Sequence, residues 1–348
     1  MPLRSELLIL LEDCKRQPES DALRFIVADW LEEHGTETDQ FRAEWVRCQV
    51  NHASLPSDHP DRDEYGRRAR WLQQRYHRAW LGPLTTWLVQ WAGQRGLLEV
   101  TLSREHCLSQ TLNGLAREEC WTWVEGVHLN EMQEPTIERL AGSQLLHRVT
   151  QVRFVGSSLG PSSGLVIGKL PWLTNLVQLD LSQQPITTRG VEALLRVGQL
   201  HHLRHLHLPG TNLTTDAGAL LAEATCAMQL ESLTLWGNAL MNQGVGGLTQ
   251  AGGPSALTRL RRLDLRSNVI GNAGAIALAE SPRLSQLQHL NLSDNAIGPE
   301  GALALAQSPH LRSLETLVLW GNPVGPTGVA VLHQRFGTRV HVSPMGQP

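Results

Sequence analysis

The chain has 348 residues, 41% of them hydrophobic, which is enough for more than one ordinary domain. Thirty Lys and Arg against 33 Asp and Glu give a formal charge of -3, which argues against bulk attraction to nucleic acid or an anionic membrane. Five widely spaced cysteines without a C-x-x-C pair indicate neither a disulfide framework nor a zinc site. The apolar stretch Leu7 to Leu11 is short and flanked by acids, so we expect no signal peptide or membrane span and a cytoplasmic protein.

Residues 1–82 form the first predicted domain, which is small and all-α. Its charge is acidic, with 12 basic and 15 acidic residues, whereas the remainder of the chain has 18 of each. Asp21 is a candidate N-cap of the second helix, and Gly35 is a good stop for it. Four helices are predicted, over Leu3 to Lys15, Asp21 to His34, Asp39 to Leu55 and Arg62 to Trp80.

Three blocks of the first domain resemble a known family. They are LRFIVADWLEEHG (Leu23 to Gly35), AEWVRCQ (Ala43 to Gln49) and WLGPL (Trp80 to Leu84). They look like the short repeat-companion domain that planctomycetes and myxobacteria carry ahead of leucine-rich or WD repeats, which would make the source bacterial. The resemblance implies no activity, because that family has no established chemistry. We expect Trp30 and Leu31 to face the core and Asp29, Glu32 and Glu33 to lie on a solvated face.

Residues 83–348 form the second predicted domain, with about nine repeats of the pattern L-x-x-L-x-L-x-x-N. Clear copies are LESLTLWGN (Leu230 to Asn238), LRRLDLRSN (Leu260 to Asn268), LQHLNLSDN (Leu287 to Asn295) and LETLVLWGN (Leu314 to Asn322). Successive fourth positions are separated by 27, 25, 27, 27, 27, 30, 27 and 27 residues and are Val100, Val127, Val152, Leu179, Leu206, Leu233, Leu263, Leu290 and Leu317. An insertion around Gly252-Gly253-Pro254 accounts for the longest interval.

Each repeat combines a strand with a helix. The alternating L-x-L core predicts a half-buried strand, and the second half, as in Gly274 to Leu287, shows a helical apolar face. Pro282 and Pro309 should end their helices because proline lacks an amide proton. We expect the ninth-position Asn to turn inward and bond backbone groups. This ladder should be weaker in the earlier repeats, which have Met132, Ser157, Gln184 and Thr211 there.

The repeats resemble the ribonuclease-inhibitor type, also found in Nod-like receptors and the GTPase-activating protein of Ran. The likeness rests on the length of about 27 residues and on the pattern I-G-x-x-G-A-x-A-L-A (Ile270 to Ala279, Ile297 to Ala306), and it covers roughly residues 95–343. Strands pack about 4.8 Å apart but helices about 8–10 Å apart, so the expected α/β leucine-rich-repeat solenoid has a curved parallel sheet inside and helices outside. The helical domain is expected to cap the first strand of this solenoid.

The concave side of the sheet carries the candidate binding residues. The third, fifth, seventh and eighth positions of each repeat should project there, and Trp236 and Trp320 flank Arg266 in the seventh column. Trp and Arg most often carry binding energy at interfaces, although these indoles could instead only shield their neighbours. We predict a partner surface formed by Trp236, Arg262, Asp264, Arg266, Asn291, Asp294 and Trp320, together with His205 and His207.

Two further patterns on the sheet are not read as sites. Asp180, His207 and Thr234 share the fifth position of adjacent strands and mimic an acid, a base and a nucleophile. We do not predict catalysis, because Thr is a poor nucleophile without activation and no oxyanion donors are evident. His205 and His207 provide two imidazoles on one face without a third ligand, so we expect solvated histidines, no metal and no cofactor.

The sequence therefore predicts a non-catalytic protein-protein interaction module that is monomeric on its own. Its expected partner is a protein held on the concave face, with no nucleic acid and no membrane involved. The alternative is regulation of a partner enzyme, either inhibition of a hydrolase or activation of a GTPase, as the resemblance to ribonuclease inhibitor and the Ran activator implies. Fold does not decide between them.

Overall fold

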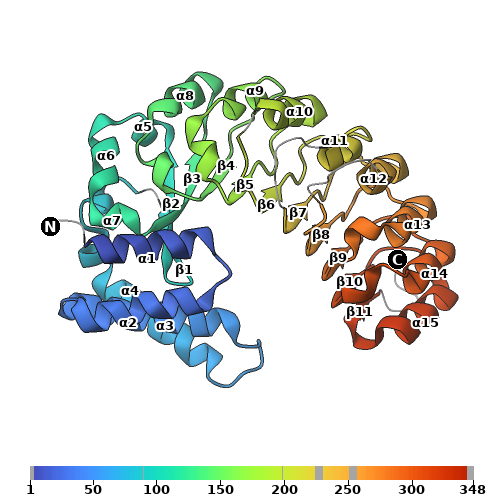
Figure 1. Cartoon of the computed structure of the whole chain (residues 1–348), viewed down its shortest axis with the longest axis horizontal. Helices are drawn as coiled ribbons and strands as arrows, with labels where there is room; N and C mark the ends of the chain where they lie inside the picture. The colour runs from blue at the N-terminus through green and yellow to red at the C-terminus, as the bar shows by residue number, and fades with distance from the viewer. Residues whose placement is uncertain (1–3, 89, 198, 224–229, 251–256, 343–348) are drawn as a thin grey trace. The chain divides into compact units, whose positions relative to one another are not determined.

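The structure is a computed structural model that describes residues 4–88, 90–197, 199–223, 230–250 and 257–342. The chain forms two compact units: unit 1 contains residues 1–131 and 142–153, and unit 2 contains residues 132–141 and 154–348. The elements are labelled in Figure 1. The predicted insertion at Gly252-Gly253-Pro254 and the thiol of Cys226 lie outside the described residues.

Unit 1 consists of four long helices, a β-hairpin, a parallel strand and several short helices. Its strands are β1 (Gln90–Gln94), β2 (Leu97–Ser103) and β3 (Val124–Asn130), of which β1 and β2 are antiparallel and β2 and β3 parallel. Its helices are α1 (Ser5–Arg16), α2 (Asp21–His34), α3 (Glu37–Ser54), α4 (Arg62–Leu81), α5 (Arg104–Cys107), α6 (Gln110–Gly114) and α7 (Glu119–Thr122), and its 3₁₀ helices are η1 (Gly82–Thr86), η2 (Leu115–Arg117) and η4 (Leu146–Arg148). Two elements, η3 (Leu140–Gly142) and β4 (Gln151–Val155), contain residues of both units.

The four predicted front helices are confirmed, with corrections at their ends. Helix α2 runs from Asp21 to His34 as predicted, but its N-cap is Ser20, because the Ser20 hydroxyl accepts the Leu23 amide while Asp21 is already helical. Helix α3 begins two residues before the predicted Asp39. The reason is a capping box, in which the Thr36 backbone N–H donates to the Asp39 carboxylate at 2.7 Å.

The prediction for the acidic block of α2 is only partly right. Leu31 is fully buried, but Trp30 is half-buried and its indole N–H donates to Glu6 at 3.1 Å, near the surface. Trp30 also stacks on His34 in the next turn, with 5.1 Å between ring centroids. An indole with a polar end is more easily satisfied at the rim of a core than inside it. Asp29 and Glu32 are exposed, as expected.

Strand β1 of the hairpin was not predicted from the sequence. Helix α3 contacts this hairpin closely. The Gln49 side chain of α3 donates to the Gly93 carbonyl at 2.9 Å and accepts from the Gly96 amide at 2.8 Å. Gly93 lies against the ring of buried Trp45, so a side chain at this position would clash with the indole. Helix α3 therefore satisfies backbone groups of the first hairpin.

A cluster of buried charges joins the first helices to β3. Lys15 of α1 donates to the Arg148 carbonyl at 3.1 Å, and burial lowers its pKa to about 8. Arg24 of α2 lies 3.7 Å from the Glu125 carboxylate and donates to the Arg95 carbonyl at 2.8 Å. Burial raises the pKa of Glu125 to about 7, in spite of the two cations nearby. Desolvation thus outweighs attraction in this cluster, which orients the helices more than it stabilises them.

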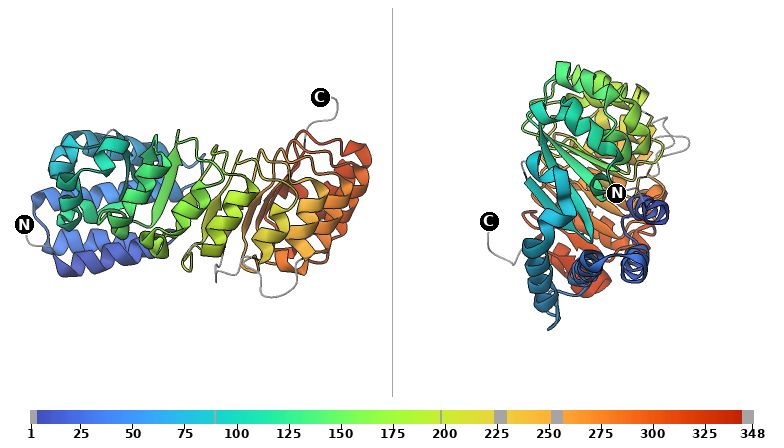
Figure 2. Two further views of the ribbon diagram at one scale, coloured as in Figure 1. Left: turned by 90° about the horizontal axis from the view of Figure 1, so that it is seen from above. Right: turned by 90° about the vertical axis from the view of Figure 1, so that its left-hand side faces the viewer.

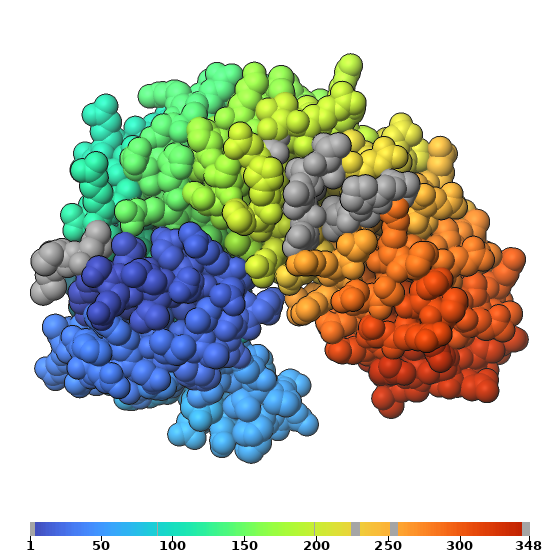
Figure 3. Space-filling model, in the orientation of Figure 1, coloured from blue at the N-terminus to red at the C-terminus, as the bar shows by residue number. Residues whose placement is uncertain are grey.

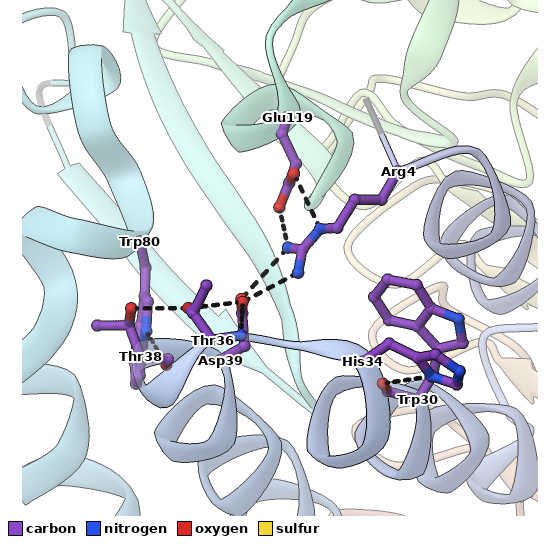
Figure 4. A network of polar contacts seen from close by, with 8 residues as sticks. All are labelled: Arg4, Trp30, His34, Thr36, Thr38, Asp39, Trp80 and Glu119. Atoms are coloured by element: carbon purple, nitrogen blue, oxygen red, sulfur yellow. Dashed lines mark hydrogen bonds and ion pairs between the residues drawn. The ribbon is translucent and has the colours of Figure 1, made fainter. Parts of the chain in front are cut away.

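Two arginines add polar contacts between the helices of unit 1. Arg42 of α3 is 4% exposed and stacks on Trp123 with its guanidinium carbon 3.6 Å from the ring centroid, and burial lowers its pKa to about 9. Arg4 bridges two helices, since its guanidinium pairs with Asp39 of α3 at 2.9 Å and with Glu119 of α7 (Figure 4). These contacts tie α1, α3 and α7 into one unit.

Unit 2 is built from regular strand-helix repeats. Its strands are β5 (Gln178–Asp180), β6 (His205–His207), β7 (Ser232–Thr234), β8 (Arg262–Asp264), β9 (His289–Asn291), β10 (Thr316–Val318) and β11 (Val340–His341), all parallel and hydrogen-bonded in chain order. Its helices are α8 (Glu134–Arg139), α9 (Ser163–Gly168), α10 (Thr187–Val197), α11 (Ala217–Glu223), α12 (Met241–Gln250), α13 (Asn272–Glu280), α14 (Pro299–Gln307) and α15 (Gly325–Phe336), and its 3₁₀ helices are η5 (Pro171–Asn175), η6 (Pro282–Leu284), η7 (Leu311–Ser313) and η8 (Gly337–Arg339).

The two layers of unit 2 have the predicted arrangement. Its strands follow the inner side of a curve and its helices the outer side, and successive helices lie side by side (Figures 1 and 2). Helices α13 and α14 end at Glu280 and Gln307, just before the Ser-Pro pairs that contain Pro282 and Pro309, as predicted. The fold is therefore an α/β leucine-rich-repeat solenoid.

The fourth-position leucines of unit 2 form a single row across the sheet. Strand register pairs each with the next, and each is at most 2% exposed: Leu179, Leu206, Leu233, Leu263, Leu290 and Leu317. Burial of one such side chain contributes roughly 1.5–3 kcal/mol, and each contributes only when a neighbouring repeat covers it. The inference on which the sequence analysis depended is confirmed.

The ninth-position asparagines form the expected inward ladder. The Asn268 side-chain amide donates to the carbonyls of Leu235, Leu265 and Arg266 at 2.9, 3.1 and 3.0 Å. Earlier repeats vary at this position: the Ser157 hydroxyl donates only to the Val155 carbonyl, whereas the Gln184 amide donates to the carbonyls of Phe154 and Ser182 at 3.4 and 3.2 Å. The ladder is thus weaker at Ser157, because a hydroxyl has one proton to donate and an amide has two.

We predict that Asn268→Ala will lower the free energy of unfolding by about 2–4 kcal/mol, because three carbonyls in a dry region lose their donor. Asn322→Ala, at the same repeat position but half-buried, should cost less. Urea unfolding followed by circular dichroism measures both. Equal losses for the two variants would contradict a role for buried hydrogen bonds.

A second prediction concerns Glu125, whose pKa rises from 4.5 to about 7 on folding. The folded protein then binds the proton more tightly than the unfolded chain, so this term of stability is complete below pH 4.5 and is lost as the pH rises to about 7. Relative to the wild type, Glu125→Gln should therefore gain up to about 3 kcal/mol across this range. Unfolding curves at several pH values test this, with exposed Glu105→Gln as the control. Parallel profiles for wild type and Glu125→Gln would be inconsistent with it.

Candidate functional site

The predicted partner surface lies on unit 2. Arg262 and Asp264 are on β8 and Asn291 is on β9, while the remaining residues near the C-terminal end follow the strands. Register places Arg262 beside His289 and Asp264 beside Asn291. Arg262 is exposed, and Asp264 and Asn291 are half-buried. The structure therefore brings these three residues onto adjacent strands, as the repeat spacing predicts.

Trp236 and Arg266 contact each other on this surface. The Arg266 guanidinium carbon lies 4.9 Å from the centroid of the Trp236 ring, a cation-π contact between the turns after β7 and β8. Both side chains are half-buried, so one part of each packs while the other faces solvent. The contact pre-orders two residue types that often dominate binding energy, and it reduces the entropy that a partner would have to remove.

Polar groups beside this pair are held by local hydrogen bonds. One Asp264 carboxylate oxygen accepts the Arg266 backbone N–H at 3.0 Å, and the Asn291 side-chain oxygen accepts the Ser293 N–H at 3.0 Å. Burial raises the pKa of Asp264, against the opposing effect of the Arg266 N–H. Each side chain bonds a backbone amide two residues further on, which fixes its orientation at the end of the strand.

Trp320 is the most exposed member of the surface, with 55% of its area accessible to solvent. Its ring makes an edge contact with His341 on β11, with 6.3 Å between centroids. It follows β10, two strands from the one that carries Arg266, so about 10 Å of sheet separates them. Asp294 is also exposed and follows the strand between them. The two tryptophans thus lie on either side of Arg266, and the cation-π contact is with Trp236.

The eighth position has a backbone feature that the sequence analysis did not identify. Its residue has a positive φ between 53° and 69° in every repeat from the third strand onwards, whether or not it is glycine: Glu131, Gly156, Gln183, Gly210, Gly237, Ser267, Asp294 and Gly321. The turn leaves the seventh residue half-buried at Trp236 and Arg266 and exposed at Trp320, whereas Pro209 and Ser293 at the same position are buried. At the ninth position Asn238 and Asn268 point inward. The recurring glycine in the W-G-N triplets was the available signal, because glycine favours this conformation.

The two predicted histidines occupy different environments. His207 is half-buried, and its Nδ1 lies 3.0 Å from the Thr234 hydroxyl on the next strand. His205 is only 7% exposed, so the expectation of two solvated imidazoles is wrong for this residue. His205 is the first residue of β6, where its register neighbours are Gln178 on β5 and Ser232 on β7, and Ser232 is itself only 8% exposed. His205 therefore contributes little surface to a partner.

Asp180, His207 and Thr234 occupy adjacent positions of three strands, as the spacing predicts. Their contacts are those of a polar ladder. The Asp180 carboxylate is 8% exposed and accepts the Ser182 backbone N–H at 2.8 Å as well as its hydroxyl. The Asp180 carboxylate thus fixes the turn at the end of its own strand, and Asp180 is buried there.

Within the described residues, no three His, Cys, Asp or Glu side chains are grouped so that they could hold a metal ion. None of the helices in those residues is long and apolar enough to cross a membrane. Cys14, Cys48 and Cys107 are buried free thiols, and burial raises the pKa of each. These thiols are packing residues and not nucleophiles.

Comparison with known proteins supports the fold. A family model described as a leucine-rich repeat matches residues 256–279 and 285–306. No curated protein matches the chain. A chain of the crystal structure of the Rad7 and Elc1 complex in yeast is similar, with a TM-score of 0.50 and 15% identity over 95% of this chain and 92% of that chain.

Two other solved structures are less similar. A chain of the LRIM1/APL1C complex has a TM-score of 0.34 and 14% identity, over 71% of this chain and 54% of that chain. An internalin from Listeria monocytogenes has a TM-score of 0.25 and 16% identity, over 72% of this chain and 87% of that chain. At this level of identity the yeast likeness shows the fold alone, which agrees with the repeats seen in unit 2.

The left-handed turn after Trp236 leads to a prediction about stability. Gly237 has a φ of 69°, and an added Cβ would meet the Gly210 backbone nitrogen only at 3.7 Å, an ordinary contact distance, so Gly237→Ala should lower the free energy of unfolding by about 1 kcal/mol through backbone strain. Gly246, inside α12 with nothing within 4 Å of an added Cβ, is the control, and Gly246→Ala should raise stability by up to about 1 kcal/mol. Chemical denaturation of the two variants would show opposite shifts, and shifts of the same sign would refute this account of the turn.

Proposed function

We propose that the chain is a non-catalytic protein-protein interaction module that binds a protein on the strand side of unit 2. The observation that carries this proposal is the ordered Trp236–Arg266 pair beside the exposed Trp320. An indole that is 55% exposed on a folded surface has apolar area that a partner can bury. The proposed surface contains Trp236, Arg262, Asp264, Arg266, Asn291, Asp294 and Trp320, with His207 at its margin.

The charge pattern of this surface favours a protein over a polyanion. Arg262 and Arg266 are accompanied by the carboxylates of Asp264 and Asp294, so both signs alternate over neighbouring strands. A mixed pattern selects a partner with complementary charges and disfavours a uniformly charged one. The similar yeast structure is a complex of Rad7 with Elc1, and this is consistent with a protein partner here.

We further infer that the repeats are of the ribonuclease-inhibitor type and that residues 1–82 form a repeat-companion domain. The repeat length of 27 residues, the helix in each repeat and the order of α1 to α4 support this. We also infer a monomeric cytoplasmic protein without a cofactor, which agrees with the three buried free thiols. Regulation of a partner enzyme would use the same surface, and the partner's turnover in the presence of the protein decides that question.

The experiment is a quantitative affinity purification from the native source with wild type and the double variant Trp236→Ala/Trp320→Ala. The double variant should retain less than about a tenth of the proteins bound specifically by wild type, because it removes both indoles from the surface. Leu303→Ala, at a 41% exposed position on α14, controls for loss of an exposed apolar side chain on the helix side. Undiminished capture by the double variant, with unchanged circular dichroism, would refute the assignment.

A further inference from the structure

Helix α4 of unit 1 has a long exposed side that is rich in arginine. The helix contains six arginines and only two acids, Asp63 and Glu64, both in its first turn. Its buried side carries Ala69, Leu72 and Trp80. Six exposed residues of the helix are here named the arginine face: Arg67, Arg70, Trp71, Gln74, Arg75 and Arg78. In Figure 3 the light-blue segment between α3 and α4 projects from the rest of unit 1, and α4 follows it.

The guanidinium groups of the four arginines of this face form no ion pair or hydrogen bond with any residue that the structure describes. Arg68, at the edge of the face, differs: it pairs with Glu44 of α3 at 2.6 Å and stacks on Trp71, with its guanidinium carbon 4.5 Å from the ring centroid. Trp71 remains 48% exposed. The face thus combines uncompensated guanidinium groups with one ordered aromatic ring.

Helix geometry gathers these side chains on one side. Arg67, Trp71, Gln74 and Arg78 follow the spacing of a single row, which extends about 16 Å along the axis. Arg70 lies beside this row, three residues from Arg67, so two like charges are neighbours on the helix surface. Adjacent like charges destabilise a helix by a few tenths of a kcal/mol per pair, and an anionic partner would reverse that effect.

The surrounding charge restricts the kind of anion. Residues 4–61 contain 6 basic and 13 acidic residues, whereas α4 contains 6 basic and 2 acidic. A nucleic acid is charged along its whole length, and its phosphates beyond the arginine face would meet this acidic excess. A short acidic peptide segment matches the length of the face and avoids the repulsion. Arginine also pairs bidentately with carboxylates.

We propose that the arginine face of α4 docks an acidic segment of a protein partner, with carboxylates on Arg67, Arg70, Arg75 and Arg78 and an apolar side chain against Trp71. This site lies on unit 1 and is independent of the surface proposed on unit 2. The net charge of -3 hides it, because the acids of the other front helices compensate for the arginines.

The test uses fluorescein-labelled hexaglutamate as the probe, with binding to the full chain followed by fluorescence anisotropy. Wild type should bind it, more weakly at 200 mM than at 50 mM salt, and Arg67→Glu/Arg78→Glu should weaken binding at least about tenfold. Arg67→Gln/Arg78→Gln is a second variant that keeps the proposal testable if charge reversal disturbs the helix. The matched control is Arg189→Glu/Arg259→Glu, an equal charge change at exposed positions of unit 2.

Three results would overturn the proposal. The first is absence of binding by the wild type, and the second is equal weakening by the unit 2 control, which would indicate a response to net charge alone. The third is tighter binding of a ten-residue oligothymidylate than of hexaglutamate, with the same dependence on Arg67 and Arg78, which would assign the face to nucleic acid.

Discussion

The structure of unit 2 depends on one constraint: each repeat buries its leucines only against the next repeat. The row from Leu179 to Leu317 is continuous through six strands, and every member is at most 2% exposed. Strand length is a consequence, because three residues suffice to present one buried side chain and its two outward neighbours. Strands spaced more closely than helices then curve the sheet, which leaves the polar positions on its strand side free to vary without affecting the fold.

Buried polar side chains also hold the repeats of unit 2 together. The ninth-position asparagines satisfy carbonyls where the strands end, and a left-handed residue precedes each of them in the turn. Trp236 and Arg266 are half-buried and stand in the same turns as the buried Asn238 and Asn268. The proposed binding surface and the hydrogen-bond ladder therefore share these turns, so the asparagines support the proposed surface as well as the fold.

Unit 1 is held together by other contacts than unit 2. Its hairpin of β1 and β2 is contacted by the front helices through Gln49 and Arg24, and Arg24 also lies beside the buried Glu125 of β3. Buried charges are costly, as the shifted pKa values of Lys15 and Glu125 show, but they accept one geometry only. The outer side of α4 takes no part in this cluster, and its arginines are exposed to solvent. One helix block therefore offers a specific inner face and a charged outer one.

The sequence by itself determined the repeat fold, the four front helices and the positions of the outward columns, because periodic burial of leucine and the lack of an amide proton in proline act locally and repeat. It also placed Arg262, Asp264 and Asn291 on adjacent strands, since register follows from the repeat length. Only the tertiary structure decided how exposed each residue is and which residues are in contact. His205 is buried, Trp30 is half-buried, and Arg266 contacts the ring of Trp236. Strand β1 and the buried charge cluster also required it, because both arise from contacts between residues far apart in the chain, which leave no periodic signal.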